Sequence, residues 1–161
     1  MLATRLLTAS AGFLLAVLWM DLIFDVQVWS APAGAPLPAE ILGSIAAYYR
    51  RATTTSAPMS ALIALVMCVG IGSALVAARR RDVAAWRRIL AVVLVVAPVA
   101  LAFLRVVPNA VRLGAATDTP LVQSELARGI LRDHLACFAS VATLLALQIG
   151  APRRGGGRTV E

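Results

Sequence analysis

Four long apolar runs divide this chain, and they constrain its fold more than any other feature. The runs are Leu6–Val26, Met59–Ala78, Ile89–Val107 and Leu131–Ile149. Each is close to the roughly 20 residues that an α-helix needs to cross about 30 Å of hydrocarbon. The chain is 60% hydrophobic, whereas soluble domains usually hold about 45–50% apolar residues. The sequence therefore predicts an all-α protein, a four-transmembrane-helix bundle that forms one domain over residues 1–150.

Charge and composition point to a membrane partner. The formal net charge is +7, and all 15 basic residues are arginines. A basic soluble protein would suggest nucleic acid. Here the arginines flank apolar runs, so we expect the lipid bilayer as the partner, and no nucleic acid. Exclusive use of arginine is typical of GC-rich bacterial genomes. The pattern leaves the oligomeric state open.

The arginines also predict the orientation of the bundle, because cytoplasmic loops carry an excess of Lys and Arg. The N-terminal stub, the second loop and the C-terminal tail hold nine arginines, against six in the other loops and their margins. The nine are Arg5, Arg79, Arg80, Arg81, Arg87, Arg88, Arg153, Arg154 and Arg158. We expect a multi-pass protein of the bacterial inner (plasma) membrane with both termini cytoplasmic. Residues 151–161 should form a flexible basic cytoplasmic tail.

The first loop carries a helix signal of its own. Residues Leu37–Arg51 predict a short amphipathic helix in this extracytoplasmic loop, lying on the outer surface or folded over the bundle as a lid. Its apolar face would come from Ile41, Leu42, Ile45 and Tyr48 or Tyr49.

Three further local features concern the later spans. Ser124 is the predicted N-cap of a helix that runs into the fourth span. Pro98 should kink the third span. Gly70, Gly72 and Ser73 should let the second span pack closely against a neighbour.

Polar residues inside or beside the apolar runs are the candidate site. Ionisable groups near lipid are costly, so they usually mark a site, a pathway or a buried pair. With the orientation above, several of them fall near the outer leaflet, and we predict a polar pocket between spans one, three and four. The residues concerned are Asp21, Asp25, Arg105, Asn109, Arg132 and His134. An alternative stays open, in which Arg105 and Arg132 reach the headgroups and pair with the two aspartates only to fix helix register.

The same residues argue against a metal or cofactor. His134 is the only histidine, which excludes a multi-histidine metal site, and no Glu-x-x-His pair lies on the spans. The chain has no phosphate-binding loop, nucleophile elbow or haem-attachment motif. Cys68 and Cys137 both lie inside apolar runs and do not imply a disulfide framework. We therefore expect no metal and no cofactor.

Two segments resemble a known family. Val107–Leu113 (VPNAVRL) resembles the end of span three in DUF1772 membrane proteins, the anthrone-oxygenase-like family, and Ile130–Cys137 (ILRDHLAC) resembles the opening of span four. In that family a tryptophan and an arginine stand where this chain has Ile130 and Cys137. The resemblance implies a four-span fold and oxidation of anthrones to anthraquinones without metal or flavin. It also implies that Asn109 and His134 are the catalytic positions, with the histidine as a base on an acidic phenol.

Three functions follow from these observations. The first is a cofactor-independent enzyme that oxidises a hydrophobic aromatic small molecule entering from lipid, marked by His134 and Asn109 facing a pocket. The second is a non-enzymatic accessory membrane protein that contacts partner proteins or lipids, marked by a surface of small residues and no cavity. The third is a small proton-coupled transporter that uses Asp21 or Asp25.

Overall fold

The computed structural model describes residues 2–79 and 83–150, and its regular structure within these ranges is entirely helical. In chain order the elements are α1 (Leu2–Asp25), the 3₁₀ turn η1 (Val26–Ser30), α2 (Ala39–Thr54), α3 (Ala57–Ala78), α4 (Ala85–Leu101), the π-helical segment η2 (Ala102–Val106), α5 (Val107–Ala115) and α6 (Pro120–Ile149). The predicted basic tail, 151–161, and two arginines of the second loop, Arg80 and Arg81, lie outside the described residues.

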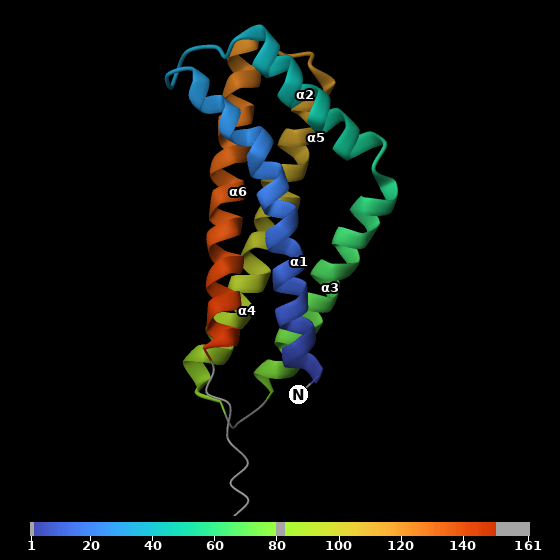
Figure 1. Ribbon diagram of the computed structural model, residues 1–161, viewed down its shortest axis with the longest axis vertical. Helices are drawn as coiled ribbons and strands as arrows, with labels where there is room; N and C mark the ends of the chain where they lie inside the picture. Colours follow the sequence, from blue (N-terminus) through green and yellow to red (C-terminus); the bar gives the residue numbers. More distant parts are fainter. Residues whose placement is uncertain (1, 80–82, 151–161) are drawn as a thin grey trace, which may run out of the picture.

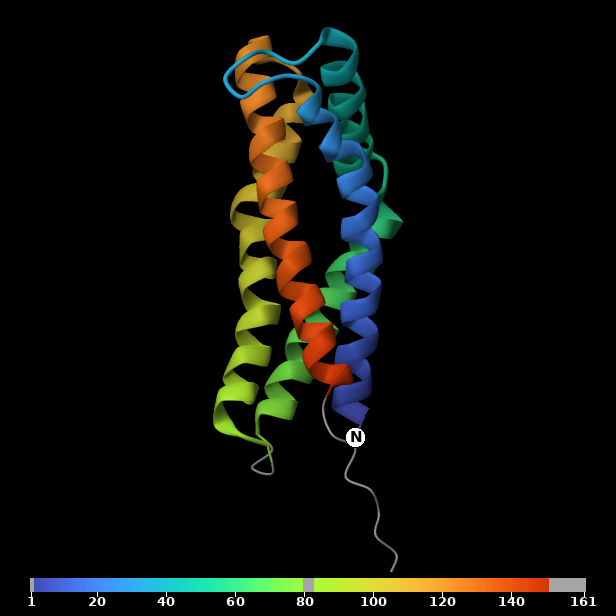
Figure 2. The ribbon, with the colours of Figure 1, turned by 60° about the vertical axis from the view of Figure 1, so that its left-hand side comes forward.

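The predicted bundle of four membrane-spanning helices is confirmed. Four stretches are long and apolar enough to cross a membrane: Leu2–Ser30, Ala57–Ala78, Ala85–Ala115 and Pro120–Ile149. They run side by side along the long axis, while α2 lies across one end (Figures 1 and 2). The protein is therefore an all-α, multi-pass membrane protein in its architecture.

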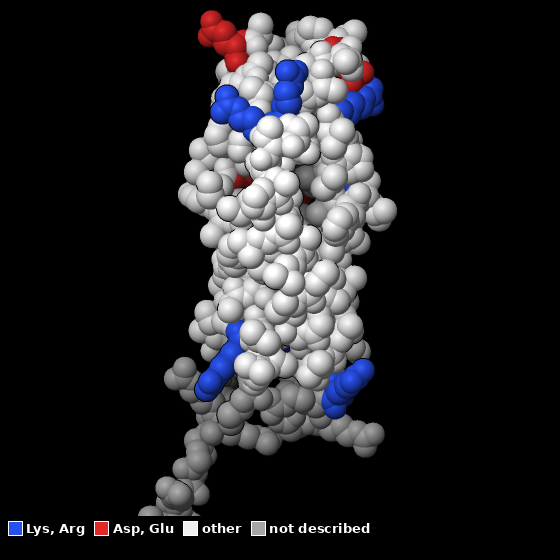
Figure 3. All heavy atoms as spheres, turned by 90° about the vertical axis from the view of Figure 1, so that its right-hand side faces the viewer, with Lys and Arg blue, Asp and Glu red and all other residues white. Residues whose placement is uncertain are grey.

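The two ends of the bundle are different, and we name them by what they carry. The cap end holds α2, α5 and the start of α6, and the base end holds the N-terminus, the end of α3 and the start of α4. Figure 3 shows a broad band with few charged side chains between arginines at both ends, and the spans that form this band are apolar. Such a band flanked by basic residues is the pattern of a chain that spans a bilayer.

The last two spans are longer than their apolar runs predict. The third span passes through Pro98 and η2 directly into α5, and α6 begins at Pro120. Of these extra turns, α5 is amphipathic and packs one face against α2. The predicted N-cap is wrong: Thr119 caps α6, and its hydroxyl accepts a hydrogen bond from the Val122 amide. Ser124 lies inside the helix.

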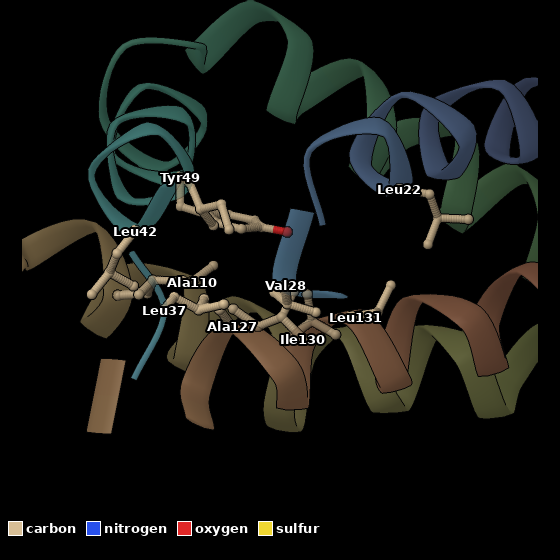
Figure 4. Packing of buried hydrophobic residues seen from close by; sticks show 12 residues of the cluster. Leu22, Val28, Leu37, Leu42, Tyr49, Ala110, Ala127, Ile130 and Leu131 are labelled. Carbon is tan, nitrogen blue, oxygen red and sulfur yellow. The ribbon is translucent and has the colours of Figure 1, made fainter. Parts of the chain in front are cut away.

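Two hydrophobic clusters form the interior. The cap core joins α1, η1, α2, α5 and α6, and Figure 4 shows Tyr49 extending into it from α2. The base core joins α1, α3, α4 and α6 around Leu7, Val95 and Leu144. Close packing of α3 is confirmed at Gly70, where an added Cβ would lie 3.6 Å from Ser10 Cβ, and at buried Ser73. The prediction of close packing is wrong at Gly72, which faces open space.

Candidate functional site

A chain of buried hydrogen bonds links three helices near the cap end. Asp25, at the end of α1, is 1% exposed. One of its carboxylate oxygens accepts a hydrogen bond from the Tyr49 hydroxyl of α2 at 2.5 Å. The other lies 2.6 Å from Nδ1 of His134 on α6. Because both oxygens have partners, a carboxylate that would be costly in an apolar interior is accommodated there.

Asp21 repeats this arrangement one turn earlier on α1. It accepts a hydrogen bond from the Tyr48 hydroxyl. The Tyr48 ring stacks on Phe24, with ring centroids 4.1 Å apart, and meets the Tyr49 ring edge-on. Burial, and next the neighbouring Asp21 and Asp25 carboxylates, raise the pKa of Tyr48 and of Tyr49 well above the usual value. Both phenols therefore stay protonated and act as donors to the two carboxylates.

The position of these tyrosines is set by how α2 packs on α5. An added Cβ at Gly114 would lie 2.8 Å from the Arg50 backbone nitrogen, so only glycine allows this approach. The Arg50 side chain donates a hydrogen bond to the Gly114 carbonyl at 2.9 Å. In the loop that precedes α2, the Leu37 amide donates a hydrogen bond to the Ser124 hydroxyl of α6. The loop is further held by Arg128, which donates to the carbonyls of residues 32 and 35.

A cavity of about 180 Å³ lies below the cluster, between all four spans. Its walls are almost wholly apolar, and Asp21 and His134 line its end nearer the cap. Val107, which also lines it, is 46% exposed, so the cavity reaches the side of the bundle. There α3 leans away from the other helices (Figure 1), and the cap-side half of α3 is largely exposed. Figure 3 shows hollows in the apolar band below the cap end.

The geometry suits a proton-accepting imidazole. Asp25 holds Nδ1 of His134, and Nε2 makes no hydrogen bond with any described residue. A carboxylate at Nδ1 favours the tautomer that leaves Nε2 free to accept a proton, and it stabilises the imidazolium that then forms. Since His134 lines the cavity, a molecule bound there would contact its side chain.

Only part of the predicted pocket comes together. Asp21, Asp25 and His134 share the site, but the other predicted residues do not. Arg105 lies on η2 with its Nε 3.1 Å from Asp133, and its side chain is 57% exposed. Arg132 is exposed. The interpretation in which Arg105 or Arg132 pairs with Asp21 or Asp25 is therefore wrong, because tyrosines and a histidine satisfy those carboxylates instead.

Asn109 also lies away from the cluster. It is partly exposed on α5, makes no hydrogen bond with the described residues and does not line the cavity. The resemblance that assigns it a catalytic position has no support from its placement. The predicted location of the pocket also needs correction, since α3 contributes to the cavity along with α1, α4 and α6.

Three residues at or beside the site are not identified from the sequence, namely Tyr48, Tyr49 and Asp133. The sequence assigns Tyr48 and Tyr49 only to an apolar face, although the amphipathic helix itself is confirmed as Ala39–Thr54. Asp133, beside His134, is buried, and the Arg105 contact lacks hydrogen-bond geometry at its Oδ2. The sequence did contain a signal for the two tyrosines. Two carboxylates on one face of span one require hydrogen-bond donors, and the first loop carries two adjacent phenols.

The described residues contain no group of three or more His, Cys, Asp or Glu placed to hold a metal ion. Cys68 and Cys137 are both free thiols, and Cys137 lies one turn beyond His134 on the cavity wall. Comparison of the chain with protein-family models, with curated proteins and with solved structures gives no match.

Proposed function

We propose that this chain is a bacterial inner-membrane enzyme of the anthrone-oxygenase-like kind, which oxidises a hydrophobic aromatic substrate without a cofactor. The observation that carries the proposal is the Asp25–His134 pair beside an apolar cavity that reaches the lipid-facing side of the bundle. A general base in an apolar site is the equipment that deprotonation of a weakly acidic phenol requires.

The chemistry balances with dioxygen as the only co-reactant. Nε2 of His134 takes the hydroxyl proton of the phenol, and the anion is delocalised onto a ring carbon that bears hydrogen. That carbon transfers electrons to dioxygen and binds it, and the proton returns from His134 to give a hydroperoxide. Loss of water then leaves a carbonyl, so the net change is a ring CH₂ (in the keto form) and O₂ to C=O and H₂O. Asp25 stabilises the imidazolium throughout.

Turnover is the direct test. Purified protein in nanodiscs should oxidise an anthrone faster than the buffer rate, followed by oxygen consumption and quinone absorbance. We expect His134→Gln to lower the rate by about 10²–10⁴-fold, and Arg132→Gln, an exposed change on the same helix, to leave it unaltered. Wild-type turnover in a folded His134→Gln protein would contradict the proposal, and so would no turnover above the buffer rate.

The proposal includes an orientation. By sequence, the N-terminal stub, the second loop and the tail carry nine of the fifteen arginines, so we place the base end, and both termini, in the cytoplasm. Ser44→Cys and Thr117→Cys, both at the cap end, should then react with an impermeant maleimide added outside cells. Reaction only after the inner face is opened would reverse the orientation.

A proton-coupled transporter is the second candidate, favoured by two carboxylates and a histidine inside the spans. It predicts proton movement across liposomes driven by a hydrophobic solute, with no oxygen consumed. The accessory-protein alternative expects no cavity, so the cavity beside Asp21 and His134 favours the other two candidates over it.

A further inference from the structure

The cavity is a long, narrow slot parallel to the bundle axis. On α1 its lining runs from Leu7 to Asp21, and on α6 from Leu144 back to His134. At 1.5 Å per residue, the α1 stretch alone covers about 21 Å. A volume of about 180 Å³ spread over that length leaves room for a chain or a single ring in cross-section. The shape therefore fits an extended molecule better than a broad one.

The two ends of the slot differ in chemistry. The cap-side end is lined by Asp21, whose carboxylate uses one oxygen for Tyr48, and by His134. The base-side end is lined by Leu7, Leu144 and Gly70, with Ser10 as its polar group. No arginine lines the slot among the described residues. The polar end thus offers hydrogen-bond acceptors and negative charge, and it offers no cation to an anionic headgroup.

From this geometry we infer the ligand class of the slot: a neutral phenolic head seated between Asp21 and His134, carrying an extended apolar tail that lies along α1 toward Gly70. The inference rests on the proposed function for the site and adds to it the shape and charge of the substrate. Anionic amphiphiles such as fatty acids should bind weakly, because their carboxylate would lie against the Asp21 carboxylate. A hydrogen bond to a charged acceptor favours the phenol.

Three ligands with one tail and different heads test the polar end. They are 4-octylphenol, 4-octylbenzoate and octylbenzene, each competed against tritiated 4-octylphenol in phosphatidylcholine nanodiscs at equal mole fraction in the bilayer. At pH 7 the phenol is neutral and the benzoate is ionised. We expect the phenol to bind about tenfold or more tightly than octylbenzene, and the benzoate to compete weakest. Asp21→Asn should reduce the preference for the phenol, whereas Arg132→Gln, an exposed change on α6 outside the slot lining, should retain it.

A pair of glycine variants tests the tail. An added Cβ at Gly70 makes ordinary contacts with Ser10 and Val95, whereas Gly72 on the same helix faces open space. We expect Gly70→Val to narrow the slot, weakening 4-octylphenol several-fold while leaving 4-ethylphenol unaffected. Gly72→Val is the matched control and should change neither. Gly70→Ala, which fits without displacement, should give a smaller loss of the same kind if the valine variant folds poorly.

The outcomes separate this inference from the proposed oxidation. Benzoate binding as tight as the phenol, or preference unchanged in Asp21→Asn, would overturn the assigned head. Tighter binding of the cation 4-octylbenzylammonium would overturn its neutrality. A tricyclic phenol that competes more strongly than 4-octylphenol, with an affinity unchanged in Gly70→Val, would overturn the tail. If binding follows the expected order and no oxidation is seen, the ligand assignment stands and the proposed oxidation is refuted. If oxidation is seen without that order, only the ligand assignment is refuted.

Discussion

The cap and base ends of the bundle hold together in different ways. At the cap end, Asp25, His134 and Ser124 are buried, and each has a hydrogen-bond partner on another helix or loop. At the base end, the cluster is apolar, and Ser10 is buried without any hydrogen bond among the described residues. Between lipid-embedded helices, association depends on packing and interhelical hydrogen bonds. The base end is held together mainly by packing, and the cap end adds interhelical hydrogen bonds.

The difference explains where the cavity has its polar end. Directional bonds require one geometry, so they hold α2 and its tyrosines at fixed positions above α1. Apolar packing tolerates gaps, and the slot extends through the region where α3 leans away. Where the hydrogen-bonded cap end meets the apolar base end, the fixed Asp25–His134 pair lies beside the apolar cavity. Four predictions test how sharp that contrast is.

The largest effect should come from breaking the buried network at Asp25. Asp25→Leu leaves the Tyr49 hydroxyl and the His134 ring without their partner in an apolar interior. Each buried polar group left without its partner typically costs about 1–3 kcal/mol, so the two together cost about 2–6 kcal/mol. We expect a loss of this size in thermal unfolding in detergent. Ser10→Ala, in the base region, should change stability by less than about 0.5 kcal/mol.

A triple variant makes this test specific. Asp25→Leu combined with Tyr49→Phe and His134→Leu removes the unpaired polar groups together with the carboxylate. Stability should then recover part of the loss, because no buried donor is left unsatisfied. A triple variant as damaged as the sum of its single changes would mean that the network is not a unit.

The next effect compares two glycines that sit at helix contacts. Gly114→Ala places a Cβ against the Arg50 backbone, which cannot move without moving α2. Overpacking of this kind costs about 1–3 kcal/mol. Gly70→Ala at the base end meets only ordinary contacts, so its stability should be unchanged or slightly raised. Equal losses at both glycines would remove the distinction between the two ends.

Sequence alone predicts the base end well and the cap end poorly. The apolar runs determine the four spans, because a run of that length has few alternatives in lipid. The extension Val107–Ala115 is not predicted as part of a span, and the predicted helix from Ser124 into the fourth span begins too late, since α6 starts at Pro120. The mixed polarity of Val107–Ala115 is typical of a loop, and as a helix this segment is stabilised by packing against α2.

The candidate site divides in the same manner. Asp21, Asp25 and His134 are recognisable because charge inside an apolar run is rare. Their partners are not recognisable, since Tyr48 and Tyr49 reach them across the fold from another element. Depth in the membrane placed Arg105, Arg132 and Asn109 near the site, but depth says nothing about which side of a helix faces the interior. That choice depends on packing, and Arg105 and Arg132 are exposed.

A smaller effect should appear at alkaline pH. Tyr48 and Tyr49 are the only tyrosines of the chain, and burial raises the pKa of both. A raised folded-state pKa means that stability is complete below about pH 10, the unfolded value, and falls as pH rises above it. Tyrosinate absorbance at 295 nm should therefore stay low in folded protein at pH 10–11 and appear on unfolding. Ordinary titration near pH 10 in folded protein would show that the cap network is open to water.

The smallest effect should come from the cap surface, where a hydrogen-bonded pair lacks the burial of the network beneath it. Arg112 binds Asp118 through two hydrogen bonds of 2.7 and 2.8 Å. These bonds lower the pKa of Asp118 below its usual value, so any contribution is present above about pH 4 and is lost on acidification through the lowered value. Because solvent and salt screen exposed pairs, Asp118→Asn should leave the unfolding temperature at pH 7 nearly unchanged, and 0.5 M salt should remove what difference remains. A loss of stability comparable to that of Asp25→Leu would mean that hydrogen bonds and ion pairs stabilise the cap end equally whether they are buried or exposed. Burial would then no longer explain why the Asp21 and Asp25 carboxylates form the site.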